Sequence, residues 1–258
     1  MINGRRLLKK YKMKWNGKKF IVDYEDEKWP LGKYYFIFDK ISDEDRVLDV
    51  ACGRGFGSFL ISQKAKEIIG VDIDVQSIKE AKNDFSNNNL SFSVGDGRKL
   101  DFPDDYFDVV VSIETIEHLN EIDQDKFINE VKRVLKPNGK LFLSAPDSYV
   151  ASKQGFSYGD FHEKEFTKDE LIDFLRKSNI FDLELYGQGR FSEPGLLRVL
   201  LNFLKSLDIF KLRKKALFRN VVKRLDRATS PVKFDYEVFK MNPDDLASHL
   251  LVICNNKK

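Results

Sequence analysis

From Arg46 onward, the chain alternates short apolar runs with stretches whose apolar positions recur at helical spacing. This alternation is typical of β-α-β units around a parallel sheet. The runs that we expect to form strands are 46–50, 67–72, 90–94, 107–113, 140–145, 181–186 and 249–254. The intervening stretches predict helices over 58–66, 75–85, 123–135 and 168–177, the last with Thr167 as N-cap and Glu170 at the capping-box position. The pattern therefore predicts an α/β fold with a seven-stranded, mostly parallel sheet.

Two regions depart from this alternation and divide the chain further. Residues 1–45 are rich in Lys, Tyr and Trp and are expected to form an N-terminal arm or lid on the domain 46–258. Trp29, Tyr34 and Tyr35 either pack this arm on the domain or stack over a ligand. Residues 194–245, before the last strand, predict a basic helical insertion because apolar positions recur at helical spacing among many Lys and Arg residues.

Composition limits the class of protein. The chain has 258 residues, of which 42% are hydrophobic and 33% charged, as in ordinary globular proteins. Two cysteines are too few for a disulfide framework and fit a reducing compartment. No apolar run reaches the roughly 20 residues that cross a bilayer, and the first residues lack the apolar centre of a signal peptide. We therefore expect a cytoplasmic protein.

The net charge of +3 conceals two basic segments. Residues 1–20 carry eight Lys and Arg and no acid, and residues 196–228 carry ten against two Asp. Such segments fit an anionic partner, and 196–228 predicts peripheral contact with an acidic membrane surface. The alternative is a helical cap over the substrate site whose basic face lies in solvent. Nucleic acid is a less favoured partner, because no known RNA-binding module accompanies the charges.

A glycine-rich turn links the strand at 46–50 to the next helix. The segment from Asp49 to Gly57 contains Gly53 and Gly55, which allow backbone to approach a ligand closely. The same layout serves dinucleotides. Two acids at later strand ends narrow the choice: Asp72 is placed to accept both ribose hydroxyls, and Asp96 to accept from an adenine amine.

Together these motifs resemble the class I S-adenosylmethionine (SAM)-dependent methyltransferases over about residues 46–146. The matching segments are Val47-Leu-Asp, Gly70-Val-Asp72, Gly95-Asp96, Phe107-Asp108 and Arg133-Val-Leu-Lys-Pro-Asn-Gly139, with Ala51 where the family usually has glycine. The resemblance implies a Rossmann-like fold whose last strand is antiparallel, with SAM as cofactor. It assigns cofactor binding to Asp49, Ala51, Gly53, Gly55, Asp72, Ile73, Asp96 and Gly97.

Candidate catalytic residues follow the fourth strand. Glu114, Glu117 and His118 lie where the carboxyl end of a parallel strand faces the ligand, and His162 follows the fifth strand at the same edge. These side chains are metal ligands by type. Alternatively His118 or His162 acts as a general base without a metal, or the group has only a structural role.

The Glu-x-x-Glu-His pattern with a later histidine resembles ubiquinone-pathway O-methyltransferases and methyltransferases of small-RNA 3′ ends. That resemblance implies Mg²⁺ or Mn²⁺ held by Glu114, Glu117, His118 and His162. Further segments, including Ser144-Ala-Pro146 and Tyr186-Gly187-Gln188, resemble methyltransferases found with glycan biosynthesis. We therefore expect methylation of a sugar hydroxyl in a glycan or its lipid- or nucleotide-linked precursor. A phenol, a quinone precursor or RNA ribose is the alternative acceptor, and a non-catalytic SAM-binding protein that docks an anionic partner is the alternative class.

Overall fold

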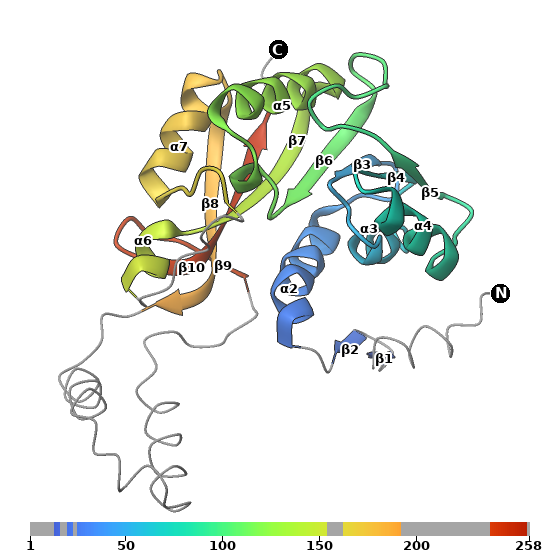
Figure 1. Cartoon of the computed structure of the whole chain (residues 1–258), viewed down its shortest axis with the longest axis horizontal. Helices are drawn as coiled ribbons and strands as arrows, with labels where there is room; N and C mark the ends of the chain where they lie inside the picture. Colours follow the sequence, from blue (N-terminus) through green and yellow to red (C-terminus); the bar gives the residue numbers. More distant parts are fainter. Residues whose placement is uncertain (1–12, 16–19, 23–24, 154–161, 192–237, 257–258) are drawn as a thin grey trace, which may run out of the picture.

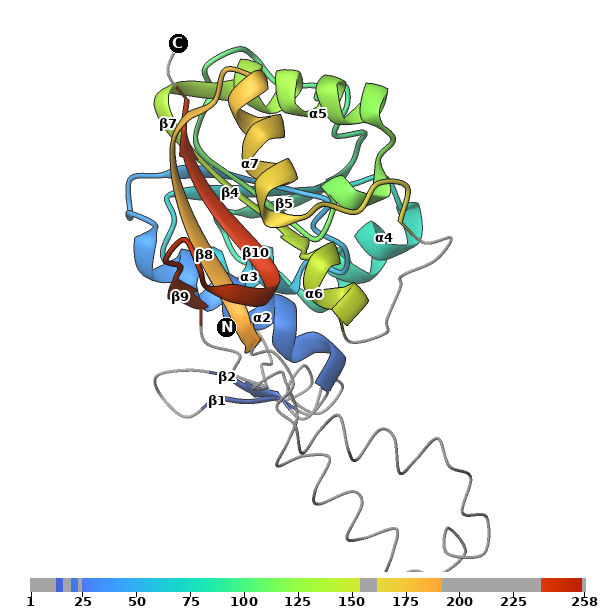
Figure 2. The same cartoon turned by 90° about the vertical axis from the view of Figure 1, so that its left-hand side faces the viewer.

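The computed structural model describes residues 13–15, 20–22, 25–153, 162–191 and 238–256. Its central feature is an eight-stranded sheet in the order β5-β4-β3-β6-β7-β10-β8-β9 (Figures 1 and 2). The strands are β3 (Arg46–Val50), β4 (Glu67–Asp72), β5 (Leu90–Val94), β6 (Phe107–Ile113), β7 (Leu135–Pro146), β8 (Phe181–Phe191), β9 (Val238–Lys240) and β10 (Leu246–Asn255). Strands β5, β4, β3, β6 and β7 are parallel, and β10 runs antiparallel to both β7 and β8. The antiparallel last strand is as expected.

Helices cover both faces of the sheet (Figure 2). On one face lie α2 (Glu25–Lys40), α3 (Phe56–Ile61) and α4 (Val75–Asp84), and on the other α5 (Glu121–Val134) and α7 (Lys168–Lys177). Adjacent strand residues enter opposite cores: Val47 packs with the α2 side and Leu48 with the α5 side. Strands buried on both faces explain the continuous apolar runs.

Shorter elements complete the described chain. Strands β1 (Met13–Trp15) and β2 (Phe20–Val22) form an antiparallel pair within the predicted arm. The 3₁₀ helix η1 (Ile116–His118) follows β6, and α6 (Ser148–Lys153) follows β7. Among the described helices, none has the length and apolar character needed to cross a membrane.

The strand count is the main correction to the expected fold. We predicted seven strands, but β9 lies within the segment expected to be helical and pairs with Tyr186–Gln188 of β8. An edge strand exposes unpaired backbone groups, and β9 satisfies those of β8. Residues 194–237 of the predicted insertion lie outside the described residues.

Several boundaries also differ from the prediction. Helix α3 begins two residues earlier than expected, after Gly55, and ends at Ile61 rather than at residue 66. Strand β7 includes the Pro137-Asn138-Gly139 cluster, which we expected to separate a helix from a strand. Asn138 has a φ of 62°, and its N–H donates to the carbonyl of Asn256, so β10 holds the cluster in the sheet. The capping box of Thr167 and Glu170 is confirmed.

Candidate functional site

The glycine loop after β3 requires backbone that most residues avoid. Gly53 and Gly55 have φ values of 53° and 79°, and Ala51 has a φ of 59°. An alanine in this left-handed region costs roughly 1–2 kcal/mol. Ala51, which stands where the family usually has glycine, therefore carries a conformational cost, because this position adopts backbone that glycine reaches freely.

Asp72, at the end of β4, holds this loop in place. Its Oδ2 accepts a hydrogen bond from the N–H of Gly53 at 2.7 Å, and its Oδ1 accepts one from the N–H of Asp74 at 2.8 Å. Each carboxylate oxygen has a second lone pair, so Asp72 retains acceptor capacity for hydroxyl donors. Next to it, Ile73 is 65% exposed, which makes it an apolar surface beside the carboxylate.

Asp96, after β5, is bound by Arg98 through two nitrogens of the guanidinium group. Arg98 also bonds to Asp123 in the first turn of α5. The adjacent Gly97 packs so closely that an added Cβ would lie 2.9 Å from Val50 and 3.0 Å from Phe127. The structure thus places Asp72, Ile73 and Asp96 at the carboxyl ends of neighbouring strands.

Asp49 has a different environment from the other two aspartates. It is fully buried, and its carboxylate accepts hydrogen bonds from the hydroxyls of Ser58 at 2.6 Å and Tyr34 at 3.0 Å. Burial raises the pKa of Asp49 to about 7, although the hydrogen bonds from Ser58 and Tyr34 lower it. The Tyr34 ring lies against Gly57, where an added Cβ would be 2.1 Å from it. Asp49 therefore links the loop to α2 from within the core.

Glu114, directly after β6, is held by residues from three other elements. It has a φ of 53°, and its carboxylate contacts the Lys33 ammonium at 2.5 Å and the Ser144 hydroxyl at 2.7 Å. The His249 Nε2 lies 3.6 Å from the same carboxylate. Burial raises the pKa of Glu114, but the charge of Lys33, the neighbouring His249 and the hydrogen bonds from Lys33 and Ser144 together outweigh burial, so the pKa lies below its ordinary value and the carboxyl is ionised. Burial, and then the charge of Lys33, lower the pKa of His249 to about 4, so its imidazole is neutral near pH 7.

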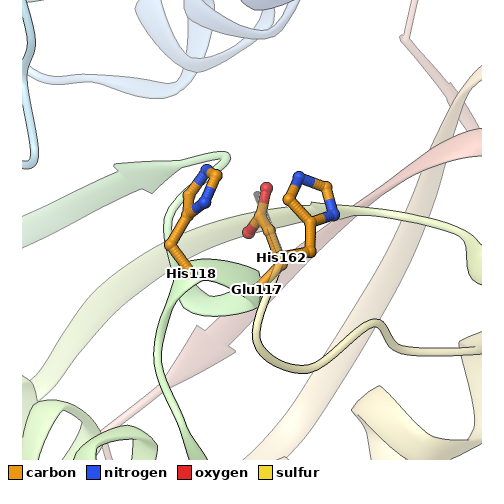
Figure 3. Close-up of side chains that lie close together, drawn as sticks. All are labelled: Glu117, His118 and His162. Carbon is orange, nitrogen blue, oxygen red and sulfur yellow. The ribbon is translucent and has the colours of Figure 1, made fainter. Parts of the chain in front are cut away.

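Glu117, His118 and His162 form a second group beside Glu114, which we call the Glu-His cluster. One ligand atom from each of the three lies within 4.8 Å of the others. Figure 3 shows the Glu117 carboxylate between the two imidazoles, whose ring centroids are 4.9 Å apart. The backbone carbonyl of Glu117 accepts hydrogen bonds from the N–H groups of Glu163 and Lys164, which brings the segment carrying His162 against η1.

The charge states in the Glu-His cluster follow from burial. Burial, and then the charge of Glu114, raise the pKa of Glu117 well above its ordinary value. Its Oε2 is buried and has no hydrogen-bond partner within the described part of the chain. Burial, and then His118, lower the pKa of His162. The cluster therefore combines neutral imidazole with a buried carboxyl group, which suits metal ligation or proton transfer.

Of the four expected metal ligands, the structure brings three together. Glu114 is instead engaged by Lys33, and it lies outside the group of ligand atoms within 4.8 Å. Sequence reasoning did not assign Lys33, Ser58, Ser144 or His249 to the site. The one signal available for Lys33 was a single cation in the apolar stretch from Trp29 to Phe38.

Comparisons with known proteins agree with this geometry. Residues 48–143 match a family of methyltransferase domains. A probable S-adenosylmethionine-dependent methyltransferase of Mycobacterium tuberculosis is 28% identical over 175 residues, which are 66% of this chain and 62% of that relative. The ubiquinone biosynthesis O-methyltransferase of Pelagibacter ubique is 31% identical over 168 residues, covering 58% of this chain and 68% of the relative. The chain thus spans less than two thirds of the mycobacterial relative.

Solved structures show the same fold. A SAM-dependent methyltransferase from Archaeoglobus fulgidus superimposes with a TM-score of 0.59 over 98% of this chain and 100% of that one, at 18% identity. The glycine loop and the carboxylates at the ends of β4 and β5 lie within the matched residues 48–143. The chain therefore belongs to the class I SAM-dependent methyltransferases.

Proposed function

We propose that the protein transfers the methyl group of SAM to a hydroxyl oxygen, on a sugar of a glycan or its lipid- or nucleotide-linked precursor. One observation carries this proposal. The Glu117 carboxylate is buried next to the imidazoles of His118 and His162, and its Oε2 lacks a hydrogen-bond partner within the described residues (Figure 3). A buried carboxylate oxygen without a partner is costly to maintain, which favours a role toward a ligand.

The donor set of the Glu-His cluster fits a divalent cation. Glu117, His118 and His162 would hold it, with two imidazole nitrogens and one carboxylate oxygen. This mixture suits Mn²⁺ or a later transition metal better than Mg²⁺, which prefers oxygen ligands. When bound, such a cation lowers the pKa of a coordinated hydroxyl by several units. Three protein ligands would leave positions for a pair of adjacent hydroxyls, which a sugar provides.

The chain's own residues supply the remaining functions. Asp72 accepts the ribose hydroxyls, and Asp96 accepts from the adenine amine. His162 is neutral because burial lowers its pKa, so it is also able to take the hydroxyl proton if no cation is bound. Lys33 neutralises Glu114, so that this partly buried carboxylate does not repel an alkoxide forming beside it.

A quinone precursor is the second candidate acceptor. The Pelagibacter relative, named as a ubiquinone biosynthesis O-methyltransferase, supports it, and a catechol also presents two adjacent hydroxyls. RNA ribose offers a third hydroxyl of this kind.

The test is methyl transfer from labelled SAM to a panel of acceptors by the full chain. The panel contains sugar glycosides, nucleotide sugars, a catechol, a ribo-oligonucleotide and a primary amine, each with EDTA, Mg²⁺ or Mn²⁺. We expect methylation of a sugar hydroxyl, loss of activity in EDTA and recovery with Mn²⁺. Full activity in EDTA would exclude a cation from the mechanism, and His118 or His162 would then act as a general base. Transfer only to the amine would refute O-methylation, and SAM binding with no transfer would favour a non-catalytic protein.

A further inference from the structure

We propose that Arg98 is a positioning residue that aims the Asp96 carboxylate at the adenine amine of the cofactor and so sets selectivity for adenine over a 6-oxopurine. The inference rests on the proposed contact of Asp96 with the adenine amine of SAM. Arg98 belongs neither to the glycine loop nor to the acids at the strand ends. Arg98 contacts Asp96 and Asp123 by hydrogen bonds, and neither of these bonds involves the Glu-His cluster.

Arg98 is fixed at both ends. Its Nε and Nη2 donate to Asp96 at 2.9 and 2.7 Å, and its Nη1 donates to the Oδ2 of Asp123 at 2.5 Å. Asp123 is itself held by the Lys126 ammonium at 2.9 Å and by the side-chain amide of Asn120. A planar guanidinium that binds two carboxylates has little rotational freedom, so the plane of the Asp96 carboxylate is fixed as well.

The Asp96 carboxylate keeps one acceptor site for a ligand. An ionised carboxylate has about four lone-pair sites. On Asp96, Oδ1 accepts from the Arg98 backbone N–H and from Nε, both at 2.9 Å. Oδ2 accepts from Nη2 at 2.7 Å. Its second contact, with Nε at 3.1 Å, is the longer branch of the bond that Nε makes to Oδ1. Within the described residues, one full site on Oδ2 is therefore left.

The remaining site suits a single N–H donor. The Asp96 side chain is 37% exposed, so a ligand can reach it, and the hydrogen bonds from Arg98 hold its pKa below the ordinary value. A carboxylate that stays ionised accepts but cannot donate. The 6-amino group of adenine satisfies it, whereas the 6-oxo group of hypoxanthine presents a second acceptor and is repelled.

A purely structural role would make Arg98 a link between the β5 loop and α5. That loop has other support: Gly97 packs against Val50 and Phe127, and the N–H of Lys99 donates to the carbonyl of Asp96 at 2.9 Å. These contacts do not involve the guanidinium. We therefore assign Arg98 to the orientation of Asp96 rather than to the stability of the loop.

The experiment measures binding of S-adenosylhomocysteine and its deaminated counterpart, S-inosylhomocysteine, by calorimetry to the full chain. The variants are Arg98→Gln and Arg98→Lys, with Lys99→Met as a matched control, because Lys99 is an exposed neighbouring cation. We expect Arg98→Gln to weaken binding of the adenosyl ligand about tenfold, as for loss of an oriented charge-assisted hydrogen bond, and to change binding of the inosyl ligand less than about twofold. Arg98→Lys keeps the charge but loses the fork, and is expected to lose selectivity as well.

Three outcomes would overturn the inference. In the first, Arg98→Gln retains the affinity and selectivity of the unmodified protein. In the second, Arg98→Gln binds both ligands more weakly by the same factor and its melting temperature falls, which indicates that Arg98 only stabilises the fold. The third outcome is tested with Asp72→Ala and Asp96→Ala. If neither variant weakens the binding of S-adenosylhomocysteine, then the cofactor assignment itself fails, and the role of Arg98 fails with it.

Discussion

Two ends of one sheet edge are built in different ways. The cofactor end comprises the glycine loop, Asp72 and Asp96, which lie at the ends of β3, β4 and β5. The acceptor end comprises Glu114 and the Glu-His cluster after β6. At the cofactor end, partly exposed carboxylates bond to backbone N–H groups or to a near neighbour in sequence. At the acceptor end, the partly buried Glu114 contacts side chains from distant segments.

This difference separates recognition from chemistry. A cofactor site built from the loops at strand ends is specified by short motifs that follow the strands in order. The acceptor end holds the fully buried Lys33 ammonium, and a buried charge is stable only when it has a partner. Its Lys33–Glu114 pair joins residues 81 positions apart, and Ser144 reaches Glu114 across 30 positions. Such a site depends on the whole fold being formed.

The largest expected effect tests whether the two ends act separately. Glu117→Gln keeps the shape of the side chain and removes the carboxylate. We expect methyl transfer to fall by about a thousandfold, the range for loss of an essential catalytic group, with affinity for SAM within about twofold of the unmodified protein. Kinetics and calorimetry on the same preparation measure both quantities.

Two further variants serve as the control and as the complementary test. Glu121→Gln is the matched control, since Glu121 is an exposed acid close by that pairs with Lys164 at the surface. Asp72→Ala is the complementary variant at the cofactor end, and we expect it to weaken SAM binding severely. Turnover retained in Glu117→Gln would remove the Glu-His cluster from the mechanism, and unchanged SAM affinity in Asp72→Ala would refute the cofactor site.

A second prediction concerns Asp49, the one acid of the cofactor end that is fully buried. Because its pKa is raised to about 7 in the folded protein, the folded state binds a proton that the unfolded state releases above about pH 4. This group's contribution to stability therefore falls as pH rises from about 4 to about 7, by at most about 4 kcal/mol. We expect Asp49→Asn to lack this fall.

The measurement is the free energy of unfolding against pH for the unmodified chain and Asp49→Asn. Asp125→Asn is the control, since Asp125 is an exposed acid on α5. Because other groups also titrate, the informative quantity is the difference between the two curves. A difference that stays constant from pH 4 to pH 8 would show that Asp49 remains ionised in the fold.

A smaller effect tests whether α2 is part of the cofactor end. In Gly57→Ala, the new Cβ would lie 2.1 Å from the Tyr34 ring, so Tyr34 must move away from Asp49. Forced overpacking of this kind typically costs about 1–3 kcal/mol. We expect a lower melting temperature and weaker SAM binding, both partly recovered when Tyr34→Ala is added. Additive losses in the double variant would show that the two positions are independent.

How much was predictable differs between the two ends. The bounds of β3, β4 and β6 followed from apolar runs, because strands buried largely on both faces leave a continuous signal. Those of the edge strand β5 followed from the alternation of Leu90, Phe92 and Val94 with two serines. The capping box of α7 was equally readable, since its two hydrogen bonds involve residues three positions apart. Strand β9 was missed, because a three-residue edge strand carries too short a pattern.

By itself, the sequence determined the α/β fold, the glycine loop and the acids Asp72 and Asp96, since these depend on contacts between near neighbours and on strand ends. The tertiary structure decided that Asp49 faces inward to Tyr34, that Glu114 pairs with Lys33 and that His162 meets Glu117. Several residue types could have served as partners for each of these buried groups. Only the packing of α2, β7 and β10 around the end of β6 fixes which partner each group has.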